Sequence, residues 1–267
     1  MKKKLLAGLL ITVALLTTAC GGNKDAKKDA VLKVGVTAGP HAEIMEVAKK
    51  VAEKDGLKIQ IVEFNDFIQP NVALNEGDLQ VNSMQHKPYL ENIIKEKKYD
   101  LYAIGNTIVL PMALYSDKYK QLANLPDGAT VAIPNDPTNG GRALLLLQQA
   151  GLIKLKDGVG VKAAPIDIVS NPKNIKLKEL DAAIISRSLK DVDLAAVNTN
   201  YALPAGLIPA KDAIAIEDAN SPYVNVFVAT GKTKDDPRVK ALVKAYQSKE
   251  VKDFIDTKYQ KAVIAGW

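Results

Sequence analysis

The sequence has a single cysteine and few of the residues that bind metals or carry out catalysis. Of its 267 residues, one is cysteine, two are histidine and one is tryptophan. One cysteine cannot form a disulfide within the chain, and two histidines without a closely spaced partner are poor zinc ligands. The chain also contains no nucleophile elbow and no His-Glu-x-x-His motif. A disulfide framework is therefore excluded, and we predict neither a metal site nor a cofactor.

The chain also lacks a strong excess of charge of one sign. Its 36 basic and 30 acidic residues give a net charge of +6, but three of the lysines are Lys2, Lys3 and Lys4. Removing these leaves 33 of the 36 basic residues against 30 acidic ones. No signal for nucleic-acid binding remains. With 47% hydrophobic and 25% charged residues, the composition is that of a globular protein with one large domain or two smaller lobes.

The N-terminus has the pattern of a bacterial export signal. Three lysines precede an apolar run from Leu5 to Ala19, which is too short to span a bilayer, and small residues lead to Cys20. Cys20 stands where lipoproteins are cleaved and acylated, for example with palmitate, although Thr17 occupies the position where leucine is usual. We predict a signal peptide at 1–19, lipidation at Cys20 and a flexible tether at 20–30. The alternative is a thiol that is buried or removed.

From Val31 onward, strand and helix patterns alternate, which predicts an α/β fold. Extended apolar runs with a proline, around Leu110 to Ala113 and around Ser221 to Val226, predict two crossings between lobes. Residues 31–110 with 226–267 would form one lobe and residues 111–225 the other, with a cleft between them. The predicted strands are "LKVGV", "KIQIVEF", "LYAIGNTIVL", "ATVAI", "IDIVS", "LAAVN", "IAIED" and "VNVFVAT", and the clearest helices cover His41 to Asp55, the segment after His86, "RALLLLQQA" and Pro237 to Tyr259.

Three polar residues are candidates for holding a charged ligand. In "AIPNDPTNGGRALLLLQQ" a strand ends at Ile133 and a helix opens near Asn139, so backbone donors there would favour an anion, and Arg142 could grip a carboxylate. An ordinary helix cap with a solvated arginine is the alternative. Asn198 and Asn225 lie at or within apolar strands, where an amide must be hydrogen-bonded. They would either accept from a ligand ammonium or bond to nearby backbone.

The stretch "VNSMQHKPYL" contains His86, one of the two histidines. Met84, His86 and Tyr89, together with Phe67, would form an apolar wall with polar tips, suited to a slender side chain. Met84 and Tyr89 could instead be simple core residues. His86 could also serve as the general base of a secreted enzyme, although no partner nucleophile is evident.

Stretches that are spread over the chain, among them "VEFNDFIQPNVALNEGDL", "VNTNYA" and "EDANSPYVNV", resemble the NlpA/MetQ family of methionine-binding lipoproteins, the receptors of the bacterial MetNI methionine importer. The resemblance covers nearly the whole chain. Two positions depart from the family, since Phe67 stands where tyrosine is frequent and Met84 where an aromatic residue is common. A third departure is "QVN" at 80–82 in place of Asp-Ala-Asn. The stretches include "VGVTAGP", "VEFNDFIQPNVALNEGDL", "QHKPYL", "IPNDPTNGGRALLLLQQAGLIKLKDGVG", "IVSNPKN", "VNTNYA", "EDANSPYVNV", "AYQS" and the final "GW".

The resemblance implies a two-lobed periplasmic-binding-type protein without catalytic activity. Arg142 would bind the ligand carboxylate, and Asn198 and Asn225 its amino group. Phe67, Met84, His86 and Tyr89 would line the side-chain pocket, with His86 near the thioether. The implied ligand is L-methionine, with D-methionine as a second candidate, and the implied partners are the permease and ATPase of an ABC importer. The lipid anchor would hold the protein at the cell envelope, facing the periplasm or the exterior.

Other functions remain open at this stage. Some relatives bind other small amino acids or peptides, so a different amino acid or a methionine-containing peptide is an alternative ligand. A secreted enzyme that uses His86 and a metal-binding receptor are alternatives from other classes.

Overall fold

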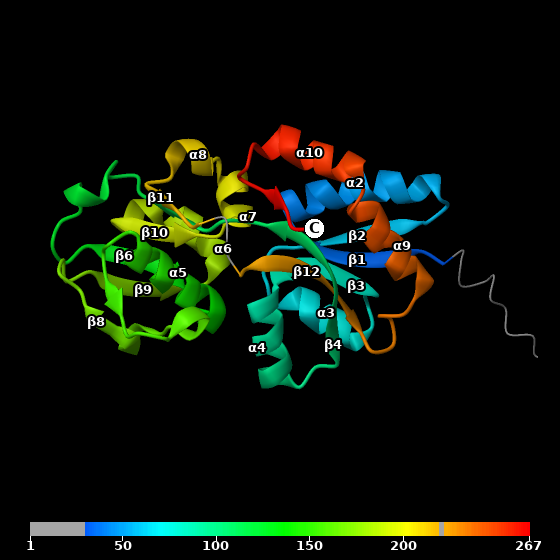
Figure 1. Ribbon diagram of the computed structural model, residues 1–267, viewed down its shortest axis with the longest axis horizontal. Helices are drawn as coiled ribbons and strands as arrows, with labels where there is room; N and C mark the ends of the chain where they lie inside the picture. Colours follow the sequence, from blue (N-terminus) through cyan, green and yellow to red (C-terminus); the bar gives the residue numbers. More distant parts are fainter. Residues whose placement is uncertain (1–29, 219–221) are drawn as a thin grey trace, which may run out of the picture.

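The computed structural model describes residues 30–218 and 222–267. The predicted signal peptide, Cys20 and the tether as far as residue 29 lie outside the described residues. The described chain forms two lobes that lie side by side, each built around its own β-sheet (Figure 1). The predicted α/β, two-lobed fold is therefore confirmed.

The first lobe contains a mixed sheet with the strand order β13-β4-β12-β3-β1-β2. β1, which lies between β3 and β2, is buried almost throughout because helices cover both faces, which explains why "LKVGV" is apolar with little alternation. β1 pairs in parallel with β2 and β3, whereas β12 runs antiparallel to β3 and β4. The strands are β1 (Leu32–Thr37), β2 (Ile59–Phe64), β3 (Val81–His86), β4 (Leu101–Val109), β12 (Val224–Thr230) and β13 (Ile264–Ala265).

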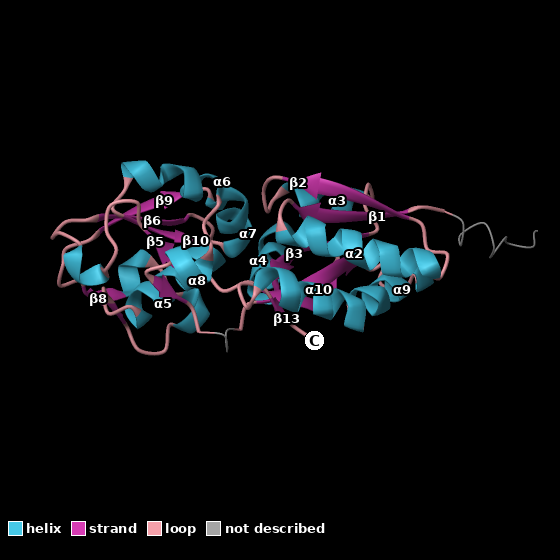
Figure 2. Ribbon diagram, turned by 90° about the horizontal axis from the view of Figure 1, so that it is seen from above, coloured by secondary structure: helices cyan, strands magenta, loops and turns pink. Residues whose placement is uncertain are grey.

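Helices cover the two faces of this sheet. On one face α2, α9 and α10 pack together with buried residues such as Ile44, Leu242 and Ile255, and on the other α3 and α4 pack through Leu74 and Leu90 (Figure 2). Prolines in the first turn, where no intrahelical donor is lost, help four of these helices to begin. The helices are α2 (Pro40–Lys54), α3 (Gln69–Glu76), α4 (Lys87–Lys97), α9 (Pro237–Tyr246) and α10 (Lys249–Tyr259).

The second lobe contains a sheet with the order β11-β5-β10-β6-β9, again with an apolar cluster on each face. Its main helix, α5, packs its leucines on β6. The strands are β5 (Ala113–Tyr115), β6 (Thr130–Pro134), β9 (Lys176–Leu180), β10 (Leu194–Val197) and β11 (Ala215–Ile216), with a separate pair of β7 (Lys154–Leu155) and β8 (Ile168–Ser170). The α-helices are α5 (Pro137–Gln149), α6 (Ala182–Ile185), α7 (Thr199–Ala202) and α8 (Pro209–Asp212), and the 3-10 helices are η1 (Leu122–Asn124), η2 (Gly160–Lys162), η3 (Pro165–Asp167), η4 (Ser186–Asp191) and η5 (Leu203–Ala205).

The chain passes from one sheet to the other between β4 and β5, through residues 110–112, and returns between β11 and β12. The division into lobes at 31–110 with 226–267 and at 111–225 stays a prediction. Every helix in residues 30–218 and 222–267 is too short or too polar to cross a membrane.

Candidate functional site

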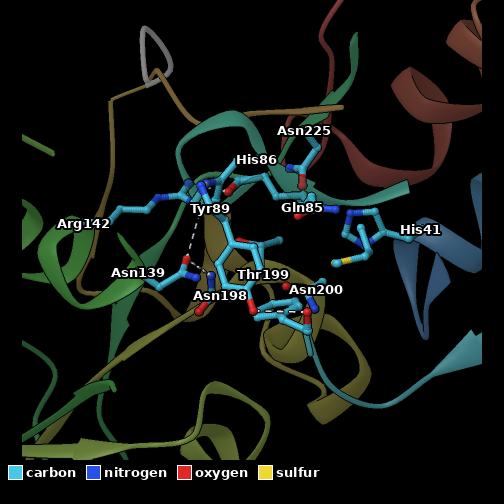
Figure 3. Close-up of a pocket in the computed structure, with 13 residues that line it drawn as sticks. His41, Gln85, His86, Tyr89, Asn139, Arg142, Asn198, Thr199, Asn200 and Asn225 are labelled. Atoms are coloured by element: carbon cyan, nitrogen blue, oxygen red, sulfur yellow. Dashed lines mark hydrogen bonds between the residues drawn. The ribbon is translucent and has the colours of Figure 1, made fainter. Parts of the chain in front are cut away.

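A pocket lies between the two lobes. Residues from both lobes line it, and Figure 3 shows them as sticks. All seven residues predicted from the sequence take part, although their roles toward a ligand stay predictions. The lining residues are His41, Phe67, Met84, Gln85, His86, Tyr89, Leu110, Asn139, Arg142, Asn198, Thr199, Asn200 and Asn225.

His86 is the last residue of β3 and the N-cap of α4, so it is placed by both elements. Its Nδ1 accepts the backbone N–H of Tyr89 at 3.1 Å. The ring proton must then lie on Nε2, which donates to Oδ1 of Asn139 in the second lobe at 3.2 Å (Figure 3). Burial, with the nearby Arg142 charge, lowers the pKa of His86 to about 3. The ring is therefore neutral, and both nitrogens already hold a hydrogen bond.

The start of α5 differs from the sequence-based prediction. The helix begins at Pro137 rather than near Asn139, and its N-cap Asp136 accepts the N–H groups of Thr138 and Asn139 at 3.2 and 2.9 Å. The predicted outward-facing donors are therefore satisfied by the protein's own carboxylate, and they do not provide an anion site. The cap also orders Asn139, whose Nδ2 donates to Asp136 at 2.9 Å.

Arg142 extends from α5 into the pocket and is only 3% exposed, so the alternative of a solvated arginine is wrong. Glu217, which directly follows β11, accepts from Nε of Arg142 at 2.9 and 3.1 Å and from Nη2 at 2.5 Å. Nη2 also donates to the carbonyl of Leu110 at 2.8 Å. The guanidinium carbon lies 4.4 Å from the centre of the Tyr223 ring. Hydrogen bonds to Glu217 and Leu110 and contact with the Tyr223 ring therefore fix the position of the guanidinium.

The amide side chains of the second lobe have unused hydrogen-bonding capacity. Nδ2 of Asn198 donates to Oδ1 of Asn139 at 2.8 Å, which gives that oxygen two donors together with His86. Oδ1 of Asn198 and Nδ2 of Asn200 are buried, and within residues 30–218 and 222–267 neither has a hydrogen-bond partner. Because buried polar atoms are rarely left unpaired, a polar ligand or ordered water must complete them.

Asn225 lies in β12 of the first lobe and is 4% exposed. It neighbours His41, whose place in the pocket no sequence pattern predicts. Burial lowers the pKa of His41 to about 4, and the Asn225 side chain opposes this shift only in part. His41 is therefore neutral, with its Nδ1 at 2.9 Å from Oγ1 of Thr37.

The apolar part of the pocket is an aromatic and thioether wall. The rings of Phe67 and Tyr89 are 6.1 Å apart at 65°, and the hydroxyl of Tyr89 donates to the Phe67 carbonyl at 3.1 Å. Met84 is 2% exposed, so it contributes to the buried interior as well as to the pocket wall. The ring of Tyr201 in the second lobe lies 5.1 Å from that of Phe67, so this wall is in contact with both lobes.

A network of buried amide side chains lies next to this wall, and one of its members, Gln85, also lines the pocket. Oδ1 of Asn71 accepts from Nδ2 of Asn82 at 2.9 Å and from Nε2 of Gln85 at 2.7 Å. Gln80, one of the departures from the family pattern, instead accepts the backbone N–H of Lys33 at 2.9 Å. That departure therefore affects a contact between neighbouring segments of the sheet and not the pocket lining.

The structure gives no support to a metal-binding alternative. Within the described ranges 30–218 and 222–267, no three His, Cys, Asp or Glu side chains are grouped so that they could hold a metal ion.

The fold and the interlobe pocket define a two-lobed binding protein of the periplasmic type.

The chain belongs to the NlpA lipoprotein family, whose model matches residues 32–267. It is 49% identical over 257 residues to the D-methionine-binding lipoprotein MetQ of Escherichia coli, covering 95% of this chain and 94% of the relative. It is also 48% identical over 268 residues to outer membrane lipoprotein 3 of Mannheimia haemolytica, covering 100% of both.

Solved structures show the same similarity in three dimensions. A nutrient-binding protein of Burkholderia cenocepacia, solved bound to methionine, is 52% identical with a TM-score of 0.86, covering 88% of this chain and 100% of the other. The methionine-binding protein MetQ is 51% identical with a TM-score of 0.87, covering 89% and 98%. The predicted family is confirmed.

Proposed function

We propose that this protein captures methionine and delivers it to an ABC importer. The observation that carries the proposal is the pocket itself, in which a buried arginine and unpaired amide atoms stand opposite an apolar wall. That arrangement offers polar contacts to a carboxylate and an ammonium, and it offers soft, polarisable surface to a thioether. The methionine-binding relatives support the same ligand.

Each pocket residue then takes a role that follows from its chemistry. Arg142 presents Nη1, the third nitrogen of its guanidinium, to the ligand carboxylate. Among residues 30–218 and 222–267 this nitrogen has no hydrogen-bond acceptor, whereas Nε donates to Glu217 and Nη2 donates to Glu217 and Leu110. The free oxygen of Asn198 and the side chain of Asn225 accept from the ammonium. Phe67, Met84 and Tyr89 enclose the side chain.

His86 acts as a pocket wall and as a contact between the lobes. A general base needs a free nitrogen and a pKa near the working pH, whereas Nδ1 and Nε2 of His86 are both engaged and its pKa is lowered to about 3. The protein is a binding protein and not an enzyme.

The cellular setting follows from the N-terminal sequence. We infer that Cys20 is acylated and anchors the protein at the cell envelope, and that the partners are the permease and ATPase of a MetNI-like importer. Comparing incorporation of a labelled fatty acid in the wild type and in Cys20→Ala tests the anchor. Equal labelling of both would rule it out.

Mass spectrometry of the ligand released from purified protein tests the main proposal, and methionine is the expected species. Calorimetry with L- and D-methionine should then show binding, which Arg142→Ala weakens by tenfold to over a hundredfold, because charged hydrogen bonds are worth about 1.5–3 kcal/mol each. An exposed arginine, replaced in Arg187→Ala, provides the matched control. Release of a different compound together with no methionine binding would contradict the proposal.

A further inference from the structure

The Arg142–Glu217 pair places two opposite charges beside the pocket. Only 3% of the Arg142 side chain and 11% of the Glu217 side chain are exposed, and two nitrogens of the guanidinium contact the carboxylate. A buried charge without a partner is costly, so Glu217 compensates for Arg142 before any ligand arrives.

The hydrogen bonds hold Glu217 behind Arg142 and away from the ligand. Oε2 of Glu217 also accepts the backbone N–H of Met112 at 3.1 Å, and the Glu217 N–H donates to the Met112 carbonyl at 2.9 Å. The carboxylate is thus tied to the segment that joins the lobes. Glu217 is not among the residues that line the pocket. Any effect of Glu217 on a ligand must pass through Arg142 and through its charge.

The remaining ionisable groups near the pocket add no net positive charge. His41 and His86 are neutral, because burial lowers the pKa of each well below 6.5. Asp136 faces the N-terminal amides of α5, whose partial positive charge opposes it. Asp66, which accepts the N–H groups of Ile68 and Gln69, and the exposed Asp181 act on Tyr89 from outside the lining. At the end of the pocket that holds Arg142, the charges of the arginine and its glutamate cancel.

We propose that Glu217 sets this neutrality and thereby makes the pocket select zwitterionic amino acids over their anionic and cationic analogues. The inference rests on the proposed function, because it assumes an amino-acid ligand whose carboxylate meets Arg142. A zwitterion brings equal and opposite charges, so the closed pocket stays neutral. An amino acid without its ammonium would add one buried negative charge, and one without its carboxylate would add one positive charge.

The test compares three ligands of nearly equal shape at pH 6.5. They are methionine, its 2-hydroxy analogue, in which a hydroxyl replaces the ammonium, and methioninamide, in which an amide replaces the carboxylate. At this pH an α-amino group is protonated, so their net charges are zero, negative and positive. In the wild type, both charged analogues should bind roughly tenfold or more weakly than methionine.

Glu217→Gln keeps the shape and one of the two acceptor oxygens but removes the charge, so the pocket becomes positive. The affinity of the hydroxy analogue relative to methionine should rise by roughly tenfold or more, and that of methioninamide should fall. Glu217→Asp keeps the charge and disturbs the geometry, so it should weaken all three ligands while preserving their ratios. Glu91→Gln, an exposed carboxylate on α4, should change nothing.

The outcomes separate the two proposals. If folded Glu217→Gln keeps the wild-type ratios, or if Glu217→Asp changes them as much, the charge argument is overturned while methionine binding stands. If Glu217→Gln does not fold, the wild-type panel still decides, because a hydroxy analogue that binds as tightly as methionine overturns the inference. A wild type that binds none of the three overturns the proposed function and this inference together.

Discussion

Buried histidines predict a specific pH dependence of stability. His41 and His86 are the only histidines in the chain, and burial lowers their pKa values to about 4 and about 3. In the unfolded chain each titrates near 6.5. Below that pH the unfolded state binds protons that the folded state does not, so the free energy of unfolding falls as the pH falls. Each histidine continues to lower the free energy of unfolding until the pH reaches its pKa in the folded protein.

The expected size of the effect follows from this difference. At pH 5.0 each histidine lies about 1.5 pH units below its unfolded pKa, and each unit is worth about 1.4 kcal/mol, so each removes about 2 kcal/mol. Urea unfolding of ligand-free protein at pH 7.5 and 5.0 measures the loss. Carboxylates titrate in every variant alike, so the loss in His41→Gln and in His86→Gln should be smaller than in the wild type by about 2 kcal/mol each. Equal losses in all three proteins would refute the reasoning.

Two further predictions concern the pocket and the approach of the lobes. Met84→Ala should leave a void beside the thioether and cost up to about 2–5 kcal/mol of methionine binding, with a smaller loss for leucine, whereas Asn225→Ala should weaken every amino acid by a similar factor. Competition binding over an amino-acid panel checks this, and proportional losses in both variants would contradict it. Gly39, with φ at +79°, would carry a Cβ 2.9 Å from Cγ of Pro204 and 3.2 Å from the carbonyl of Asn200 in the other lobe. Gly39→Ala should therefore destabilise the protein by about 1–3 kcal/mol and also lower methionine affinity, measured by thermal unfolding and calorimetry. Unchanged affinity in a folded variant would show that this contact does not govern lobe approach.

Much of the fold could be predicted because it depends on local pattern. Strand runs such as "LKVGV" and "VNVFVAT" are apolar because helices cover the sheet, and the helical pattern that opens at Pro237 marks the start of α9. The short strands β5, β9 and β13 leave no comparable local signal. They form because neighbouring strands offer backbone partners, which only the tertiary structure supplies.

The candidate site likewise contains some residues that the sequence pattern reveals and others that it does not. Asn198 and Asn225 could be found because an amide in an apolar run is costly unless something bonds to it. Glu217 could not be found, because "IAIED" resembles a strand followed by a solvated charge, and its partner Arg142 lies 75 residues earlier. The sequence pattern places Asn139 only near the start of a helix. Its contacts with His86 and Asn198 depend on how the lobes meet.

The neutral state of His86 explains why a histidine suits this position. A cation there would face the Arg142 guanidinium, and protonated Nδ1 would lose the N–H of Tyr89 that caps α4. As a neutral ring, His86 can accept from its own lobe and donate to Asn139 of the other, so one side chain joins the end of β3 to the start of α5. Because that link carries no charge, lobe contact and the charge balance set by Glu217 can be altered separately. A variant of His86 should therefore change the affinities for methionine, its 2-hydroxy analogue and methioninamide by the same factor, whereas Glu217→Gln should change their ratios.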